Sequence, residues 1–76
     1  MTSLSDIRRE ATRAGINRET FGEWMNFAIR AQRRNDLADV AYCGRKALDA
    51  YARFPTVVGP INDETLARAR AFAEAA

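Results

Sequence analysis

The sequence predicts an all-α fold, a small bundle of three to four helices over about residues 3–14, 17–34, 35–53 and 62–75. Apolar residues recur at intervals of three and four, the spacing that places side chains on one face of a helix. Serine or asparagine stands at each expected helix start, where its side-chain oxygen can accept hydrogen bonds from free backbone amides. Gly15 and the Phe54-Pro55 pair stand where two of the helices should end.

The first predicted helix, residues 3–14, begins at Ser3 or Ser5. It ends before Gly15, because glycine readily adopts the left-handed conformation that follows many helix C-termini. Its expected apolar face comprises Leu4, Ile7, Ala11 and Ala14.

The second predicted helix, residues 17–34, begins at Asn17. Ile16 and Phe21 flank this cap at the spacing of a hydrophobic staple. The inward face is predicted to comprise Phe21, Trp24, Met25, Ala28 and Gln32. Three arginines then fall at the C-terminal end of the helix, where positive charge is favourable: Arg30, Arg33 and Arg34.

The third predicted helix, residues 35–53, begins at Asn35, with Asp36 and Asp39 as favourable negative charges in its first turn. Its continuous apolar face is predicted to comprise Leu37, Val40, Ala41, Gly44, Leu48, Tyr51 and Ala52. A glycine inside a helix costs roughly 1 kcal/mol relative to alanine. Gly44 therefore indicates a position where the backbone of another helix comes close.

Residues 54–60 are predicted to form a short loop that holds Val57 and Val58. The last helix, residues 62–75, begins at Asn62. Its inward residues are predicted to be Leu66, Ala69, Phe72 and Ala73.

The chain of 76 residues is short enough to predict a single domain, residues 1–76. The formal net charge is +2, and eleven of the twelve basic residues are arginine, so composition alone does not indicate nucleic-acid binding. The single cysteine, Cys43, excludes an intrachain disulfide. The early charges argue against a signal peptide, and no apolar run approaches the ~18 residues of a membrane span. These features predict a cytoplasmic protein with no membrane contact.

The residues that most often carry chemistry are scarce. The sequence has no histidine, the most common general base and zinc ligand. Cys43 has no evident activating neighbour and is expected to be a buried or half-buried structural thiol. Asp36 and Asp39 alone seldom suffice to hold a metal ion. We therefore expect no catalytic residue, no cofactor and no metal site, and a protein that is not an enzyme.

Another protein is the expected partner. Phe27 and Tyr42 fall outside the main apolar stripes, and Val57 and Val58 lie in the expected loop. Exposed apolar groups rimmed by arginine are typical of binding surfaces and of oligomer seams, so a homodimer would also account for them. The predicted partner-binding residues are Phe27, Arg30, Arg33, Arg34, Tyr42, Val57 and Val58. The working function is a small accessory or inhibitor protein of a bacterium or phage that covers a partner's surface.

The arginines have two interpretations. Arg30, Arg33 and Arg34 have no acidic partner at favourable spacing within their own helix, so they could form a patch for an anionic surface. The more common outcome is a solvated helix end, or pairing with Asp36 and Asp39 just beyond it.

DNA binding is the alternative function. Residues 7–25 resemble a helix-turn-helix unit, with Ala11, Gly15, Phe21 and Trp24 at the expected spacing. The outward positions of its second helix are Arg18, Glu19, Gly22, Glu23 and Asn26. Two glutamates there would face phosphate, whereas recognition helices normally present hydrogen-bond donors. This composition makes a nucleic-acid partner the less favoured interpretation.

Overall fold

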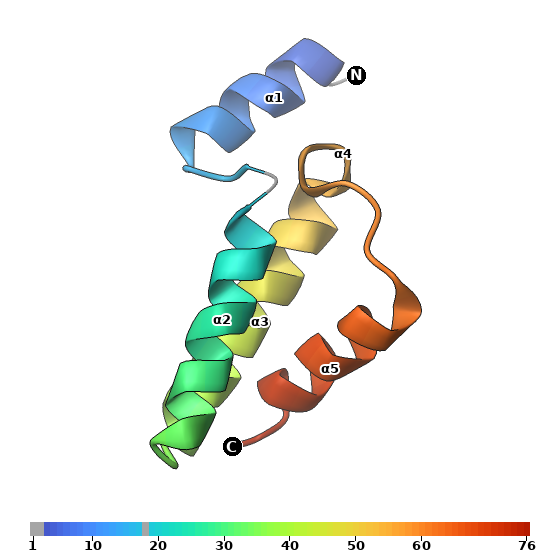
Figure 1. Cartoon of the computed structure of the whole chain (residues 1–76). Coiled ribbons are helices and arrows are strands. Elements are labelled where there is room, and N and C mark those ends of the chain that lie inside the picture. The colour runs from blue at the N-terminus through green and yellow to red at the C-terminus, as the bar shows by residue number, and fades with distance from the viewer. Residues whose placement is uncertain (1–2, 18) are drawn as a thin grey trace.

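The computed structural model describes residues 3–17 and 19–76, and in these ranges the chain is all-α, with no strand. Within these two ranges five helices follow one another (Figure 1): α1 (Leu4–Arg13), α2 (Thr20–Arg33), α3 (Leu37–Arg53), α4 (Pro55–Val58) and α5 (Asp63–Ala73). The predicted fold class is therefore confirmed. Arg18 and the side chain of Leu4, both used in the sequence predictions, lie outside the described residues.

Two of the predicted helix caps, Ser3 and Asn62, are confirmed, whereas the cap of α2 is Glu19 and not the predicted Asn17. Ser3 Oγ accepts from the Asp6 amide at 3.2 Å, and Asn62 Oδ1 accepts from the Thr65 amide at 2.8 Å. At the second helix, Asn17 Oδ1 accepts from the Glu19 amide at 2.8 Å. The Asn17 amide in turn donates to Thr20 Oγ1 at 2.8 Å, which resembles a capping box. The regular hydrogen bonding of α2 nevertheless begins at Thr20, three residues later than predicted.

The predicted cap of the third helix was wrong. Asn35 has a φ of 58° and ends α2 instead. Its amide donates to Gln32 O at 3.0 Å and the next amide, that of Asp36, donates to Ala31 O at 3.0 Å. This is the same motif that Gly15 forms after α1, and asparagine tolerates the left-handed region better than most residues. Asp36 is the cap of α3, because its Oδ1 accepts from the Asp39 amide at 3.1 Å.

Helix α3 is the centre of the fold, with α2 packed along one side and α5 along another (Figure 1). This two-sided contact explains the corrections to the predicted faces. On α3, Cys43, Ala47 and Ala50 are buried, whereas Leu37 and Ala52 are exposed. On α2 the inward residue of the last turn is Ala31, and Gln32 is exposed. The core is rich in alanine, and its larger members are Phe21, Met25, Val40, Val58 and Phe72.

Gly44 lies where α3 and α5 meet, as predicted. A Cβ at this position would lie 2.5 Å from Ala73 N and 2.8 Å from Phe72 Cβ. Since both neighbours belong to α5, the absence of a side chain at Gly44 allows the two helices to come this close.

Helix α1 lies across the end of the α2–α3 pair (Figure 1). Its anchors are the buried side chain of Ala11 and an ion pair between Glu10 Oε1 and Arg53 NH2 of α3 at 3.7 Å. Both partners of that pair are largely exposed, so it stabilises the contact by less than about 1 kcal/mol. Among the described helices, none combines the length and apolarity needed to cross a bilayer.

Candidate functional site

Three aromatic side chains gather where α2 and α3 run side by side. The Trp24 ring meets the Phe27 ring edge-on, with centroids 5.6 Å apart, and meets the Tyr42 ring in the same manner at 5.9 Å. Phe27 is 43% exposed and Tyr42 is 49% exposed, whereas Trp24 is half-buried beneath them. We call these three residues the aromatic cluster. It brings together two predicted partner-binding residues, Phe27 and Tyr42.

The helical spacing explains why these rings face outward. The core face of α2 comprises Phe21, Met25, Ala28 and Ala31. Trp24 and Phe27 are three residues apart, so they share a neighbouring face of the same helix. Tyr42 of α3 is two residues before Gly44, a rotation of about 200°, so it points away from the side that α5 covers. The cluster is thus a second apolar surface beside the core.

Positive side chains border the aromatic cluster. Arg30 and Arg34 line a hollow of about 270 Å³ together with the three aromatic rings, Asp39 and Cys43. Beyond Tyr42, the Lys46 Nζ lies 5.6 Å from the centroid of the tyrosine ring, within the range of a cation–π interaction. Two of the three predicted arginines therefore belong to the site. Arg33 is exposed but does not line this hollow.

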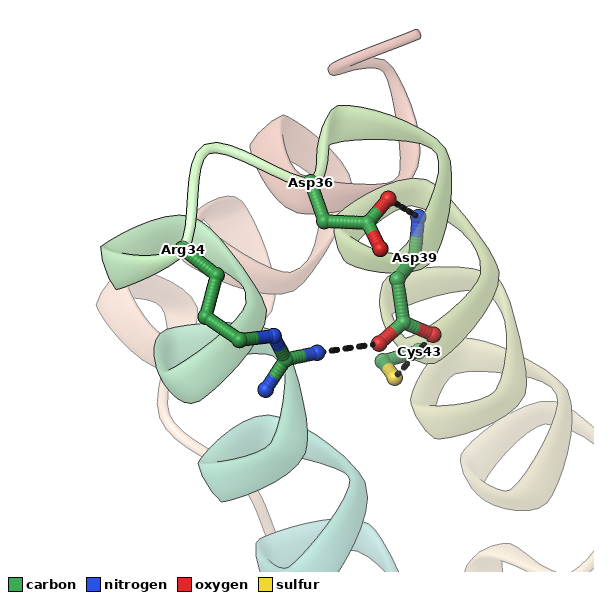
Figure 2. A network of polar contacts seen from close by, with 4 residues as sticks. All are labelled: Arg34, Asp36, Asp39 and Cys43. Atoms are coloured by element: carbon green, nitrogen blue, oxygen red, sulfur yellow. Dashed lines mark hydrogen bonds and ion pairs between the residues drawn. The ribbon is translucent and has the colours of Figure 1, made fainter.

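Arg34 is paired with an acidic residue of the next helix. Such pairing with Asp36 or Asp39 was one part of the second interpretation of the arginines. Its NH2 donates to Asp39 Oδ2 at 2.9 Å, and Figure 2 shows this bond crossing from the end of α2 to the first turn of α3. Asp36 caps the helix through the Asp39 amide. Exposed pairs of this kind stabilise a fold by ~0.2–1 kcal/mol, so the main effect of the bond is to hold the guanidinium beside the hollow. Arg30 forms no ion pair with any described acidic residue.

Cys43 is buried under this ion pair, as predicted. Its Sγ donates a hydrogen bond to Asp39 Oδ1 at 3.8 Å (Figure 2). Burial raises the pKa of the Cys43 thiol above its ordinary value, and the negative charge of Asp39 raises it further. Both effects disfavour the thiolate, the nucleophilic form of cysteine.

Alkaline pH is expected to destabilise the fold through Cys43. A raised thiol pKa contributes stability that is fully present below the ordinary value of 9.0 and is lost as the pH rises through the higher folded pKa. Urea denaturation of the wild type and of Cys43→Ala, measured on both sides of pH 9.0, isolates the contribution of the Cys43 thiol to the stability. The wild type should lose more stability with rising pH than the variant. Equal losses in the two proteins would contradict a raised Cys43 pKa.

The two valines of the expected loop do not belong to the site. Residues 55–58 form the short helix α4, with Pro55 in its first turn, where the fixed φ of proline is compatible with a helix. Val58 is only 3% exposed and joins the core, and Val57 is half-buried. The prediction that Val58 offers an exposed contact was therefore wrong. The apolar side of this one-turn helix packs against α3, and this packing buries Val58.

Trp24, Asp39 and Lys46 complete the site and were not predicted as partner-binding residues. Trp24 had been assigned to the core and Asp39 to the electrostatics of the first turn of α3. Lys46 follows Tyr42 by four residues, a spacing that places the two side chains on the same helix face. That spacing could have identified Lys46 from the sequence. The contact of Trp24 with Tyr42 could not be identified in this way, because it joins different helices.

A larger hollow, of about 400 Å³, lies between α2 and the segment that leads into α5. Its apolar lining includes Phe21, Met25, Ile29 and Ile61. Arg68 is the one charged side chain among the residues that line it. This hollow therefore lacks the combination of exposed rings and several cations found at the aromatic cluster.

The outward side of α2 bears on the DNA-binding alternative. Glu19, Gly22, Glu23 and Asn26 are exposed, as that interpretation requires, and Arg18 lies outside the described residues. Two of these four residues are glutamates and none is a cation; the exposed Arg30 and Arg33 lie further along the same helix. DNA binding stays a prediction that the geometry does not test.

In the described part of the chain, no group of three or more histidine, cysteine, aspartate or glutamate side chains could hold a metal ion. No protein family, no curated protein and no solved structure matches this sequence. The site is therefore interpreted from its own residues.

Proposed function

We propose that this protein is a non-enzymatic interaction module that binds another protein through the aromatic cluster and its basic rim. The observation that carries the proposal is the exposure of Phe27 and Tyr42 at 43% and 49%, both in edge-on contact with Trp24. Tryptophan, tyrosine and arginine are the residues most enriched among those that dominate binding energy at protein interfaces. All three types occur within this one surface.

The two exposed rings supply part of the energy that binding a partner requires. Complete burial of an exposed large apolar side chain contributes roughly 1.5–3 kcal/mol. Phe27 and Tyr42 are each about half exposed, so a partner that covered both would gain on the order of 2 kcal/mol from them. Further affinity would come from contacts with the guanidinium of Arg30 and with the rim. A module of this kind acts by occupying a surface of its partner, as an accessory or inhibitor protein does.

Capture experiments test the proposal. The immobilised wild type is expected to retain a specific protein from a lysate of the producing cells, and binding should then be reproduced with that protein in purified form. Phe27→Ala and Tyr42→Ala should each weaken binding about tenfold or more, since loss of a central interface ring commonly costs over 1.4 kcal/mol. Leu37→Ala is the matched control, because Leu37 is 54% exposed but does not line the hollow.

Two outcomes would contradict the proposal. If both ring variants bind the purified partner as tightly as the Leu37→Ala control, the aromatic cluster is not the interface. If light scattering shows a dimer that Phe27→Ala dissociates, a second copy of the chain occupies the surface instead. Binding of random duplex DNA that weakens steeply with salt would favour the DNA-binding alternative.

A further inference from the structure

The charges beside the aromatic cluster are arranged along the α2–α3 seam. Helices α2 and α3 are antiparallel, so Arg30 and Arg34 lie toward the turn that joins them (Figure 1). Lys46 lies on the other side of Tyr42, one helical turn further along α3. The seam therefore presents cations, then exposed rings, then a cation.

The cations at the two ends are not equally available. Arg34 is already neutralised by Asp39 at 2.9 Å, whereas neither Arg30 nor Lys46 forms an ion pair with a described acidic residue. Lys46 contacts the Tyr42 ring, which leaves its ammonium at the edge of the cluster. Arg45 also lines the hollow beyond Tyr42 and forms no ion pair with a described acidic residue. Arg30 and Lys46 are the cations that border the rings themselves, Arg30 in the aromatic hollow and Lys46 over the Tyr42 ring, and they are placed to receive negative charge from outside.

We propose that the partner presents an acidic segment with one apolar side chain at its centre. The apolar side chain enters the hollow against Trp24, Phe27 and Tyr42, and carboxylates on either side of it pair with Arg30 and Lys46. This inference rests on the proposed function, which it deepens by naming the chemistry of the partner. It follows from charge complementarity, which selects partners and rejects those that place like charge opposite.

The same seam favours a peptide over a nucleic acid. Asp39 lies in the wall of the aromatic hollow, and Asp49 lines the neighbouring hollow with Tyr42, Arg45 and Lys46. Glu23 lines a third hollow, on the other side of Trp24 and Phe27. A nucleic-acid backbone carries a charge at every nucleotide and would pass close to these carboxylates. A peptide can place its carboxylates only opposite the cations and an apolar group between them.

The protein contains one tryptophan, and it belongs to the site, so fluorescence of Trp24 reports binding directly. The probe is a synthetic peptide with one leucine flanked on both sides by glutamates and with no aromatic residue. Peptides in which glutamine or lysine replaces glutamate are the charge controls, and isothermal titration calorimetry gives the affinity independently. The glutamate peptide should bind about tenfold more tightly than the glutamine peptide, and the lysine peptide should bind more weakly than either.

Variants of the rim separate recognition from folding. Arg30→Glu should weaken binding of the glutamate peptide about tenfold and strengthen binding of the lysine peptide, a reversal that an unfolded protein cannot produce. Arg33→Glu is the matched control, because Arg33 is exposed on the same helix but does not line the hollow. Asp39→Asn should strengthen binding of the glutamate peptide a few-fold, since it removes the carboxylate that neutralises Arg34.

Different results would contradict the acidic-segment proposal and the proposed function. Equal affinity for the glutamate and glutamine peptides, or no binding at millimolar peptide, would overturn the proposal that the partner presents an acidic segment. The interaction module would still stand if the captured partner remained sensitive to Phe27→Ala and Tyr42→Ala. Tighter binding of single-stranded oligothymidylate than of the glutamate peptide would also overturn the inference, in favour of a nucleic acid that stacks on the rings.

Discussion

Replacing Phe72 by alanine is expected to lower the free energy of unfolding by about 3–5 kcal/mol. Phe72 is 7% exposed and is the largest side chain that α5 contributes to the core. Its removal leaves a cavity between α5 and α3 that the surrounding alanines are too small to fill. A domain of this length has roughly 4–11 kcal/mol of stability in total, so the variant loses a large fraction of it.

Urea denaturation followed by circular dichroism measures this loss, with Phe27→Ala as the matched control. Phe27 is 43% exposed, and its edge-on contact with Trp24 is worth about 1 kcal/mol. The control should therefore be destabilised far less than Phe72→Ala. Similar losses for the two variants would show that α5 does not pack on α3 as described.

Gly44→Ala is expected to destabilise the protein by about 2 kcal/mol, although alanine favours a helix by about 1 kcal/mol over glycine. The added Cβ would lie 2.5 Å from Ala73 N and 2.9 Å from the Phe72 carbonyl carbon. These neighbours are backbone atoms, so the clash cannot be relieved by turning a side chain. Helix α5 has to move away from α3, and the contacts of Phe72 loosen with it.

Gly22→Ala is the control for Gly44→Ala. Gly22 lies in the first turn of α2 and has no atom within 4 Å of where a Cβ would stand. Alanine there should raise the stability by up to about 1 kcal/mol, because only the helix propensity changes. Thermal denaturation compares the two variants, and a rise in midpoint for both would contradict the close approach of α5 at Gly44.

Phe72→Ala and Gly44→Ala change the packing of α5 on α3, whereas the candidate site lies on another side of α3. Gly44 and Tyr42 lie on nearly opposite sides of α3, one under α5 and the other in the aromatic cluster. Variants of the site should therefore change binding while leaving most of the stability. The distinction is useful in practice, because a loss of binding in Phe27→Ala can then be attributed to the surface.

The sequence predictions succeeded where the determining interactions are local. A cap such as Asn62 bonds to an amide three residues away, and Gly15 ends its helix through its own left-handed conformation. Such features depend on a few consecutive residues, so the four long helices could be predicted within a few residues of their observed ends. Gly44 was informative for a related reason, since a costly residue inside a helix requires compensation elsewhere.

The predictions failed where two structural solutions satisfy the same local chemistry. Asparagine is suited both to cap a helix and to follow one in the left-handed conformation, and Asn35 takes the second role while Asp36 takes the first. Leu37 was assigned to the core by spacing, but it is the first residue of α3 and is 54% exposed. Alanine gives a weak hydrophobic signal, so the inward positions of Ala31 and Ala47 were overlooked.

The sequence by itself determined the helical class, the caps Ser3 and Asn62, and the presence of surplus aromatic residues outside the core stripes. The tertiary structure alone decided that Tyr42 contacts Trp24 beside Phe27's own contact with it, that Arg34 pairs with Asp39, and that Val58 is buried. The physical reason is the register between helices. Periodicity shows which face of a helix is apolar. It does not show which residues of a neighbouring helix contact that face, because this depends on the relative positions of α2, α3 and α4 in the packed structure.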